Sequence, residues 1–240
     1  MRISVIIPTY NEFSRLPATF KEIKEFLEQN AEEAEIIISD GGSTDGTVDL
    51  IKSIISETGK IKVSAILEKT REGKGAGVKK GMLKAKLPFV LFMDADNSTK
   101  IKELAKFWPY SEEFQVIIGS RYAGIAAKVK QNIIRRFVSR AGSKIIRLIT
   151  GLDINDTQCG FKLFTKKASD DIFSRLETKG WGFDAEVLLL AKKLGYKIKE
   201  VPVEWRDSEG SHLRAGQDSI KTLFESVKIL KKINSNEKRK

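Results

Sequence analysis

The stretch Phe89-Val90-Leu91-Phe92-Met93-Asp94-Ala95-Asp96 places two carboxylates directly after a strongly apolar run. A short, continuous apolar run bounded by polar residues is typical of a buried strand. The runs Ile3–Thr9 and Glu35–Asp40 have a similar form, and each leads into a polar segment. Because ligands of open α/β sheets bind beyond the carboxyl ends of the strands, these three strand ends predict a binding site.

Short β-rich runs alternate with amphipathic stretches through the first half of the chain, which favours βαβ units and a parallel sheet. Two further strands are expected here, over Lys62–Leu67 and Gln115–Gly119. Helices are expected over Leu16–Glu28, Thr47–Glu57, Ala76–Ala85 and Ile101–Phe107. In the less regular second half, helices are expected over Val129–Ile149, Gly182–Leu194 and Ser219–Lys232. One last strand is expected over Lys197–Trp205.

The composition is that of a soluble globular protein, with 41% hydrophobic and 31% charged residues among 240, and it excludes a disordered chain. Cys159 is the only cysteine, which excludes an intramolecular disulfide and a cysteine-based zinc site and favours a reducing compartment. No apolar run reaches about 18 residues, so we expect no transmembrane helix. The first residues are read as a strand and not as a signal peptide.

The net charge of +11 is concentrated in one part of the chain. Between Phe114 and Leu152 there are eight Lys and Arg residues and no Asp or Glu. Such a block meets nucleic acid, anionic lipid or a phosphorylated substrate. Its interleaved Ile, Phe and Val favour a membrane surface, although a solvated helix face is the alternative. Without a known nucleic-acid-binding motif, we expect no nucleic-acid partner.

Asp94 and Asp96 can both turn toward one Mg²⁺ or Mn²⁺, which would stabilise a departing nucleoside diphosphate. The alternative is that this tripeptide forms an ordinary surface turn. Asp40 is placed to accept hydrogen bonds from a base or ribose, and the glycines after it allow close approach of a ligand. Lys74, within Gly73-Lys74-Gly75, could assist a diphosphate, or this stretch could simply begin a helix.

Several segments resemble the family 2 glycosyltransferases of GT-A fold. In the first half these are Pro8–Glu12, Asp40–Thr47, Gly73–Gly75 and Asp94–Asp96. Segments of the second half resemble, within that family, the dolichyl-phosphate glucosyltransferases, with the dolichyl-phosphate mannose synthases as close relatives. These segments are Asp156–Phe164, Trp181–Glu186 and Glu200–Trp205.

The resemblance implies a GT-A fold, which is a Rossmann-like, nucleotide-sugar-binding α/β fold with a mixed, mainly parallel sheet flanked by helices. We expect a single domain over residues 1–232, followed by a basic tail over 233–240. Within the domain, residues 1–122 would form the nucleotide-sugar-binding half. Residues 123–232 would form the half that faces the acceptor and the lipid.

The resemblance also implies roles for individual residues. The nucleoside would be held by Pro8, Tyr10, Glu12 and Asp40. The metal and the diphosphate would be held by Asp94 and Asp96. The acceptor phosphate would be met by Arg121, Arg135, Arg136, Ser139 and Arg206. Two positions depart from the family pattern: Gly41 stands where a second Asp is common, and His212 stands where a Lys is common.

The implied reaction is an inverting transfer of a hexose, with UDP-glucose as the first choice of donor and dolichyl or polyprenyl phosphate as the acceptor. Alternatives are a GDP-mannose donor and a non-lipid acceptor. A phosphate acceptor is already anionic at neutral pH, so His212 is not needed as a base. We expect the protein in the cytoplasm, peripherally attached to the cytoplasmic face of a membrane, and the oligomeric state is left open.

Overall fold

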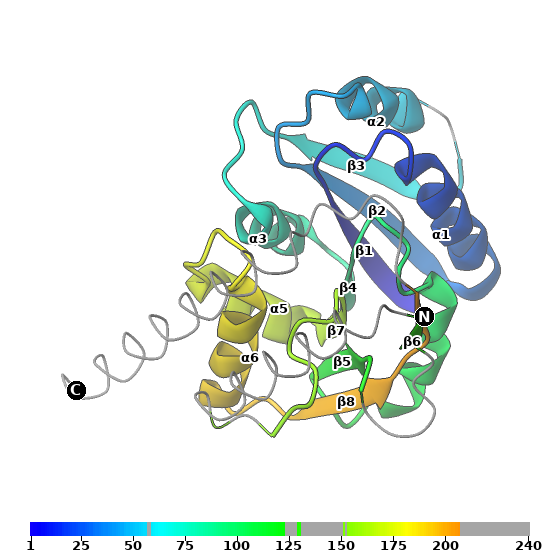
Figure 1. The fold of residues 1–240 in the computed structure, drawn as a ribbon. Coiled ribbons are helices and arrows are strands. Elements are labelled where there is room, and N and C mark those ends of the chain that lie inside the picture. Colours follow the sequence, from blue (N-terminus) through cyan, green and yellow to red (C-terminus); the bar gives the residue numbers. More distant parts are fainter. Residues whose placement is uncertain (57–58, 123–128, 131–150, 152, 207–240) are drawn as a thin grey trace.

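The computed structural model describes residues 1–56, 59–122, 129–130, 151 and 153–206. Its centre is a seven-stranded sheet in the order β3-β2-β1-β4-β7-β5-β8 (Figure 1). The strands of this sheet are Arg2–Thr9 (β1), Glu33–Asp40 (β2), Lys62–Leu67 (β3), Phe89–Met93 (β4), Val116–Ser120 (β5), Phe161–Thr165 (β7) and Ile198–Pro202 (β8). A separate parallel pair is formed by Val129–Lys130 (β6) and Trp205–Arg206 (β9).

Helices cover both faces of the sheet, so the protein has two apolar cores. One core lies under Leu16–Asn30 (α1), Thr47–Ser56 (α2) and the 3₁₀ turn Ile101–Lys106 (η1). A second 3₁₀ turn, Trp108–Tyr110 (η2), follows η1. The other core lies under Lys74–Lys84 (α3), Lys166–Arg175 (α5) and Phe183–Lys193 (α6). Because strand side chains alternate between the faces, neighbouring residues such as Ile6 and Ile7 enter different cores.

The sheet is mixed and mainly parallel, as expected. Strands β1 to β4 pair in parallel, and so do β5 and β8. Strand β7 is antiparallel to both β4 and β5, and neither β7 nor α5 was predicted. The apolar pattern of β7 is interrupted by Lys162, which is only 1% exposed because its ammonium is paired inside the protein.

Three of the expected elements differ from the structure. The strand expected over Lys197–Trp205 is divided into β8 and β9, and the helix expected over Ile101–Phe107 is a 3₁₀ turn. The helix expected over Val129–Ile149 is wrong at its start, where β6 is found. The remainder of that helix and the one expected over Ser219–Lys232 lie outside the described residues. Within the described ranges, the helices are too short or too polar to cross a bilayer.

Strands β1, β2 and β4 are neighbours and run in one direction, so their carboxyl ends meet at one edge of the sheet. The register pairs Thr9 with Asp40 across β1 and β2, and Ile6 with Phe92 across β1 and β4. The polar segments that follow these strands are therefore brought together, as predicted from the strand ends.

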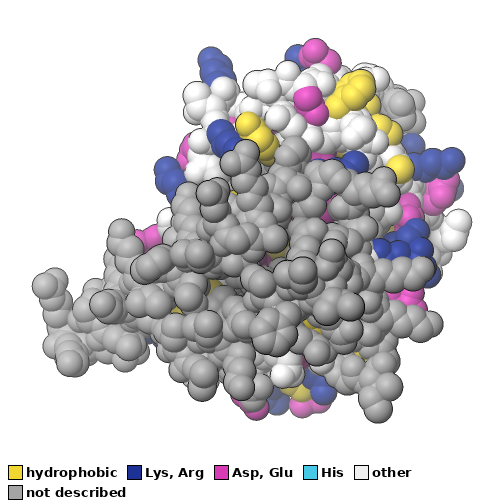
Figure 2. Space-filling view, in the orientation of Figure 1, with side chains coloured by type: hydrophobic (Ala, Val, Ile, Leu, Met, Phe, Trp, Pro, Cys, Tyr) yellow, Lys and Arg dark blue, Asp and Glu magenta, His cyan; other side chains and the backbone are white. Residues whose placement is uncertain are grey.

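The described residues carry charged side chains of both signs on their surface. In Figure 2 the Lys and Arg side chains lie in separate places around the margin, with Asp and Glu close to many of them. Lys80, for example, pairs with both Glu68 and Glu72. Most of the acid-free basic block lies outside the described residues, so its predicted membrane surface stays a prediction.

The packing of α3 on β1 gives a first testable prediction. A Cβ on Gly81 would lie 2.4 Å from Cγ2 of Ile6, which is fully buried and cannot move aside. Gly81→Ala should therefore lower the free energy of unfolding by about 1–3 kcal/mol. Urea denaturation of the purified variant measures this difference.

Gly77→Ala is the matched control in the same helix. A Cβ at Gly77 would be 3.5 Å from the Ser39 hydroxyl, an ordinary contact. Alanine is also the better helix former, so this variant should be neutral or stabilised by up to about 1 kcal/mol. Equal unfolding midpoints for the two variants would show that contact with β1 does not determine the choice of glycine.

Candidate active site

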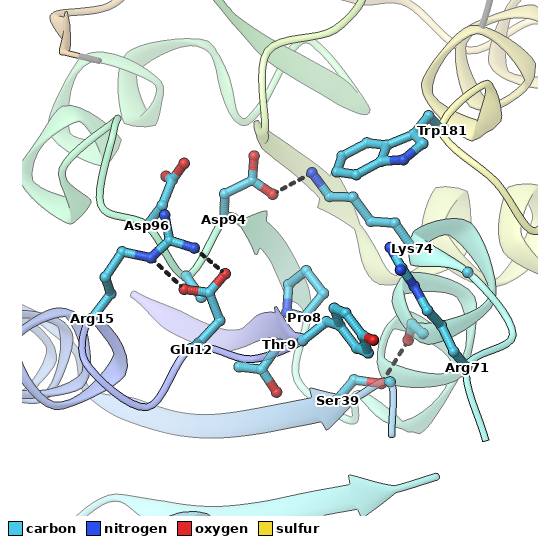
Figure 3. Close-up of a pocket in the computed structure, with 15 residues that line it drawn as sticks. Pro8, Thr9, Glu12, Arg15, Ser39, Arg71, Lys74, Asp94, Asp96 and Trp181 are labelled. Carbon is cyan, nitrogen blue, oxygen red and sulfur yellow. Dashed lines mark hydrogen bonds and ion pairs between the residues drawn. The ribbon is translucent and has the colours of Figure 1, made fainter. Parts of the chain in front are cut away.

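A pocket opens at the carboxyl ends of β1, β2 and β4 (Figure 3). Six of the seven residues predicted to bind the donor line it: Pro8, Tyr10, Glu12, Lys74, Asp94 and Asp96. Five further polar or aromatic side chains in the lining were not predicted: Thr9, Arg15, Ser39, Arg71 and Trp181. The lining therefore combines three carboxylates with three cationic side chains and two aromatic rings.

Asp40 is the predicted donor residue that does not line the pocket, because its side chain is turned into the protein. It is fully buried. One carboxylate oxygen accepts hydrogen bonds from the backbone N–H groups of Gly42 and Ser43, at 3.0 and 2.9 Å. The other accepts from the hydroxyls of Ser43 and Thr9. Asp40 thus shapes the loop after β2, and the adjacent Gly41 lines the pocket in its place.

Asp94 is held from two sides. Its backbone N–H donates to the carbonyl of Gly160 at 3.0 Å, and its Oδ1 lies 2.6 Å from the Lys74 ammonium. A Cβ on Gly160 would lie 1.9 Å from Asp94 Oδ2, so only glycine leaves room for this carboxylate. Strand β7 begins at the next residue, which explains why the unpredicted antiparallel strand belongs to the site.

The charges around Asp94 are unbalanced toward the negative. Burial raises the pKa of Asp94 above its ordinary value, and the nearby Asp96 and Asp184 raise it further, although Lys74 opposes them. Burial lowers the pKa of Lys74, but Asp94 and Asp184 outweigh that effect and hold it above its ordinary value. Burial is the largest cause of the Asp94 shift; the neighbouring carboxylates add to it and also raise the pKa of Lys74. Added positive charge would offset this excess of negative charge.

Asp94 and Asp96 suit a divalent cation. Figure 3 shows Asp94 and Asp96 on the same side of the pocket, with the Asp94 carboxylate turned toward Lys74. Mg²⁺ is commonly held by one or two carboxylates together with substrate phosphates, and this pair supplies the protein share of such a site. In the described part of the chain, no group of three or more His, Cys, Asp or Glu residues is arranged to hold a metal ion.

The glycines around Lys74 allow another segment to pack closely. A Cβ on Gly73 would lie 2.3 Å from the carbonyl oxygen of Lys179, and one on Gly75 would lie 2.4 Å from that of Thr178. Gly73 also has φ of +116°, a conformation that L side chains rarely adopt. This packing brings Trp181 beside Lys74, whose ammonium is 5.0 Å from the indole centroid. Helix α3 therefore begins at Lys74, and Gly73 and Lys74 also line the pocket.

Two arginines that the sequence did not single out contact predicted nucleoside residues. Arg15 forms two hydrogen bonds of 2.7 Å with the carboxylate of Glu12. Arg71 stacks its guanidinium 4.0 Å from the ring centroid of Tyr10. Neither arginine lies in a recognisable motif. Arg15, near the start of α1, and Arg71, in the loop before α3, were not identifiable from sequence, because the fold alone brings them to the pocket.

Arg121, predicted to meet the acceptor phosphate, is paired inside the protein. Its side chain is 11% exposed and forms two hydrogen bonds, of 2.7 and 2.9 Å, with the fully buried carboxylate of Asp156. The backbone N–H of Arg121 donates to the same carboxylate. Burial raises the pKa of Asp156, but Arg121 outweighs this effect and holds it below its ordinary value. Arg121 therefore has a structural role, and its predicted contact with the acceptor stays a prediction.

Of the other residues predicted to bind the acceptor, the structure describes only Arg206. Arg135, Arg136 and Ser139 lie outside the described residues, as does His212. The backbone N–H of Arg206 donates to the carbonyl of Ser98 at 2.9 Å, which fixes β9 beside the turn that follows Asp96. Cys159 is 1% exposed, and burial raises the pKa of its thiol to about 12, as suits a buried structural residue.

Known proteins are similar to this chain in both sequence and fold. Residues 4–173 match the family described as Glycosyl transferase family 2. The chain is 33% identical over 239 residues to a dolichyl-phosphate beta-glucosyltransferase of Dictyostelium discoideum, covering 95% of this chain and 73% of that protein. It is also 33% identical over 245 residues to the Saccharomyces cerevisiae protein of that name, with the same coverage of 95% and 73%.

Solved structures with low sequence identity share the fold. Glucosyl-3-phosphoglycerate synthase from Mycobacterium tuberculosis, solved with Mn²⁺ and UDP-glucose, matches with a TM-score of 0.67 and 19% identity, over 95% of this chain and 79% of that one. Mannosyl-3-phosphoglycerate synthase from Rubrobacter xylanophilus matches with a TM-score of 0.71 and 16% identity, over 100% and 76%. The fold is GT-A, and the chain belongs to glycosyl transferase family 2.

Proposed function

We propose that this protein transfers glucose from UDP-glucose to the phosphate of dolichyl phosphate or another polyprenyl phosphate. The observation that carries the proposal is the meeting of Asp94, Asp96 and Lys74 in one pocket at the strand ends. The chain surrounding that pocket is similar, over 95% of its length, to dolichyl-phosphate beta-glucosyltransferases. The pocket would bind the nucleotide sugar, and the acid-free basic block between Phe114 and Leu152 would meet the lipid.

The donor is held by charge and by shape. Tyr10, stacked with Arg71, presents a rigid surface for the nucleoside. Asp94 and Asp96 would hold a divalent cation, which stabilises the charge that develops on the departing diphosphate. Lys74 adds a second positive charge on the same side, and the Trp181 ring lies beside its ammonium. A site organised in advance of the reaction needs little rearrangement as the glycosidic bond breaks.

The acceptor needs positioning more than activation. A phosphate monoester is anionic at neutral pH, so one of its oxygens attacks the anomeric carbon without a general base. Attack from the face opposite the leaving diphosphate inverts that carbon. Arg135 and Arg136 would grip the phosphate, because a guanidinium binds phosphate through two parallel hydrogen bonds. The basic residues between Phe114 and Leu152 would hold the protein at an anionic membrane surface on the cytoplasmic side.

The experiment that tests the proposal is direct. The purified protein is incubated with Mg²⁺ or Mn²⁺, polyprenyl phosphate and one of a panel of radiolabelled nucleotide sugars that includes UDP-glucose and GDP-mannose. Label should enter the lipid extract with UDP-glucose and depend on the acceptor. If label enters the lipid only with GDP-mannose, the transferred sugar is mannose and not glucose. Failure of every donor to label the lipid would overturn the lipid acceptor.

Asp96→Asn tests the carboxylate pair. The substitution removes a negative charge with little change in volume, so the fold should persist while transfer falls by at least about a hundredfold, equivalent to ~2.7 kcal/mol. Asp49→Asn, on the exposed surface of α2, is the matched control and should retain activity. Near-normal transfer by Asp96→Asn in the presence of a chelator would refute the metal-assisted mechanism.

The predicted acceptor arginines should separate into two classes. Arg136→Ala should lower transfer by at least about tenfold, equivalent to ~1.4 kcal/mol, with UDP affinity unchanged by calorimetry. Lys144→Ala, in the same acid-free segment, is its control and should show a milder, salt-sensitive rise in KM for lipid. Equal behaviour of these two variants would reduce Arg136 to part of a diffuse basic surface.

Arg121→Ala should act differently, because it leaves the buried Asp156 carboxylate without its cation. Removing one partner of a buried ion pair costs about 3–5 kcal/mol, so the melting temperature should fall. Arg136→Ala should melt like the wild type. A stable Arg121→Ala with reduced transfer would instead place Arg121 solely at the acceptor.

A further inference from the structure

Lys74 contacts the carboxylate of Asp94, which a divalent cation would also need. Its ammonium lies 2.6 Å from Asp94 Oδ1, and both side chains are mostly buried, with 20% and 30% of their surface exposed. Figure 3 shows Lys74 reaching across the pocket to Asp94. The other oxygen, Oδ2, packs against Gly160, and a metal ion on either oxygen of this carboxylate would lie close enough to the ammonium for strong mutual repulsion. Lys74 and a bound metal therefore compete for Asp94.

The surroundings keep Lys74 in the pocket wherever its ammonium points. Its ammonium lies 5.0 Å from the ring centroid of Trp181 and 5.6 Å from that of Phe92, so two aromatic faces attract it. The charges of Asp184 and Asp96 attract it as well. Lys74 can therefore give up Asp94 without moving out to solvent.

The charges nearest the Lys74 ammonium, leaving aside the Glu12–Arg15 pair and Arg71 elsewhere in the lining, favour joint binding of metal and diphosphate. Three carboxylates, those of Asp94, Asp96 and Asp184, face two ammonium groups, because Lys162 is paired with Asp184 at 2.5 Å. This group carries one net negative charge. A divalent cation alone would make it positive by one, and the doubly charged diphosphate of a nucleotide sugar alone would make it negative by three. When both ligands bind, the net charge stays at minus one. A poorly solvated site favours such binding because the net charge does not change.

We propose that Lys74 and the divalent cation are alternative partners of Asp94, and that the diphosphate of the donor releases Lys74 from Asp94 to admit the metal. The inference rests on the proposed donor site and adds that the diphosphate must be present before the metal binds well. Metal alone binds weakly, because it must displace Lys74 with no anion to receive it. With a diphosphate present, Lys74 exchanges one anion for another, and Asp94 and Asp96 would then be available to hold the metal.

Lys74→Met tests the exchange, because methionine keeps the length of the side chain without its charge. Mn²⁺ binding in the absence of nucleotide, measured by electron paramagnetic resonance, should become at least about tenfold tighter in the variant. UDP binding in EDTA, measured by calorimetry, should become weaker. The factor by which Mn²⁺ increases UDP affinity should be smaller in the variant than in the wild type, since that factor measures the coupling of the two ligands.

Lys80→Met is the matched control. It removes the same charge from the same helix, but Lys80 pairs with Glu68 and Glu72 outside the pocket. Its Mn²⁺ and UDP affinities should equal those of the wild type. Thermal melting provides a second readout, because Asp94 loses its partner in Lys74→Met. Mn²⁺ alone should raise the melting temperature of that variant more than it raises that of the wild type.

The outcomes separate this inference from the proposed function. If Lys74→Met weakens UDP binding but leaves Mn²⁺ affinity and the coupling factor unchanged, Lys74 is a fixed diphosphate ligand and the exchange is refuted. If Lys74→Met binds Mn²⁺ more tightly by the same factor with and without UDP, Lys74 only repels the metal and the exchange is also refuted. If the wild type binds no Mn²⁺ even with UDP present, the proposed metal site fails and this inference fails with it.

Discussion

The contact between the Lys74 ammonium and the Asp94 carboxylate is the interaction on which the site depends. Parallel strands gather the carboxylates at one edge of the sheet, and the Lys74 ammonium opposes the burial that raises the pKa of Asp94. The glycines around the pair serve this contact: Gly160 leaves space for Asp94, while Gly73 and Gly75 admit the segment that carries Trp181. The proposed nucleotide pocket and the proposed cation site therefore depend on one electrostatic arrangement.

Buried ion pairs also join the second half of the chain to this edge. Lys162 lies in β7, next to β4, and pairs with Asp184 at the start of α6. Arg121 follows β5 and pairs with Asp156 in the segment that leads to Gly160. Breaking either pair would leave an uncompensated buried charge. Both pairs lie near Gly160, whose carbonyl accepts the Asp94 backbone N–H. They therefore stabilise the antiparallel strand β7 together with the candidate site.

Local pattern was enough to predict the parallel part of the fold and the place of the pocket. Apolar runs that end in polar residues identify β1, β2 and β4, and a parallel sheet places their carboxyl ends at one edge. The strand order, in which β4 lies beside β1, was not predicted. Strand β7 was not predictable, because Lys162 interrupts its pattern and its partner Asp184 lies 22 residues away. Arg15 and Arg71 were missed for a similar reason, since only the fold shows where they lie. The buried positions of Asp40 and Arg121 likewise depend on hydrogen-bond partners that no motif specifies.

A crystal structure of the protein with UDP and Mn²⁺, with the metal located by its anomalous scattering, tests the central claim most directly. The account predicts one strong peak between the carboxylates of Asp94 and Asp96 and the diphosphate oxygens. The uridine would lie beside Tyr10, and the Lys74 ammonium would lie against the diphosphate. A metal peak away from both carboxylates, or a nucleotide outside the pocket at the ends of β1, β2 and β4, would contradict the account.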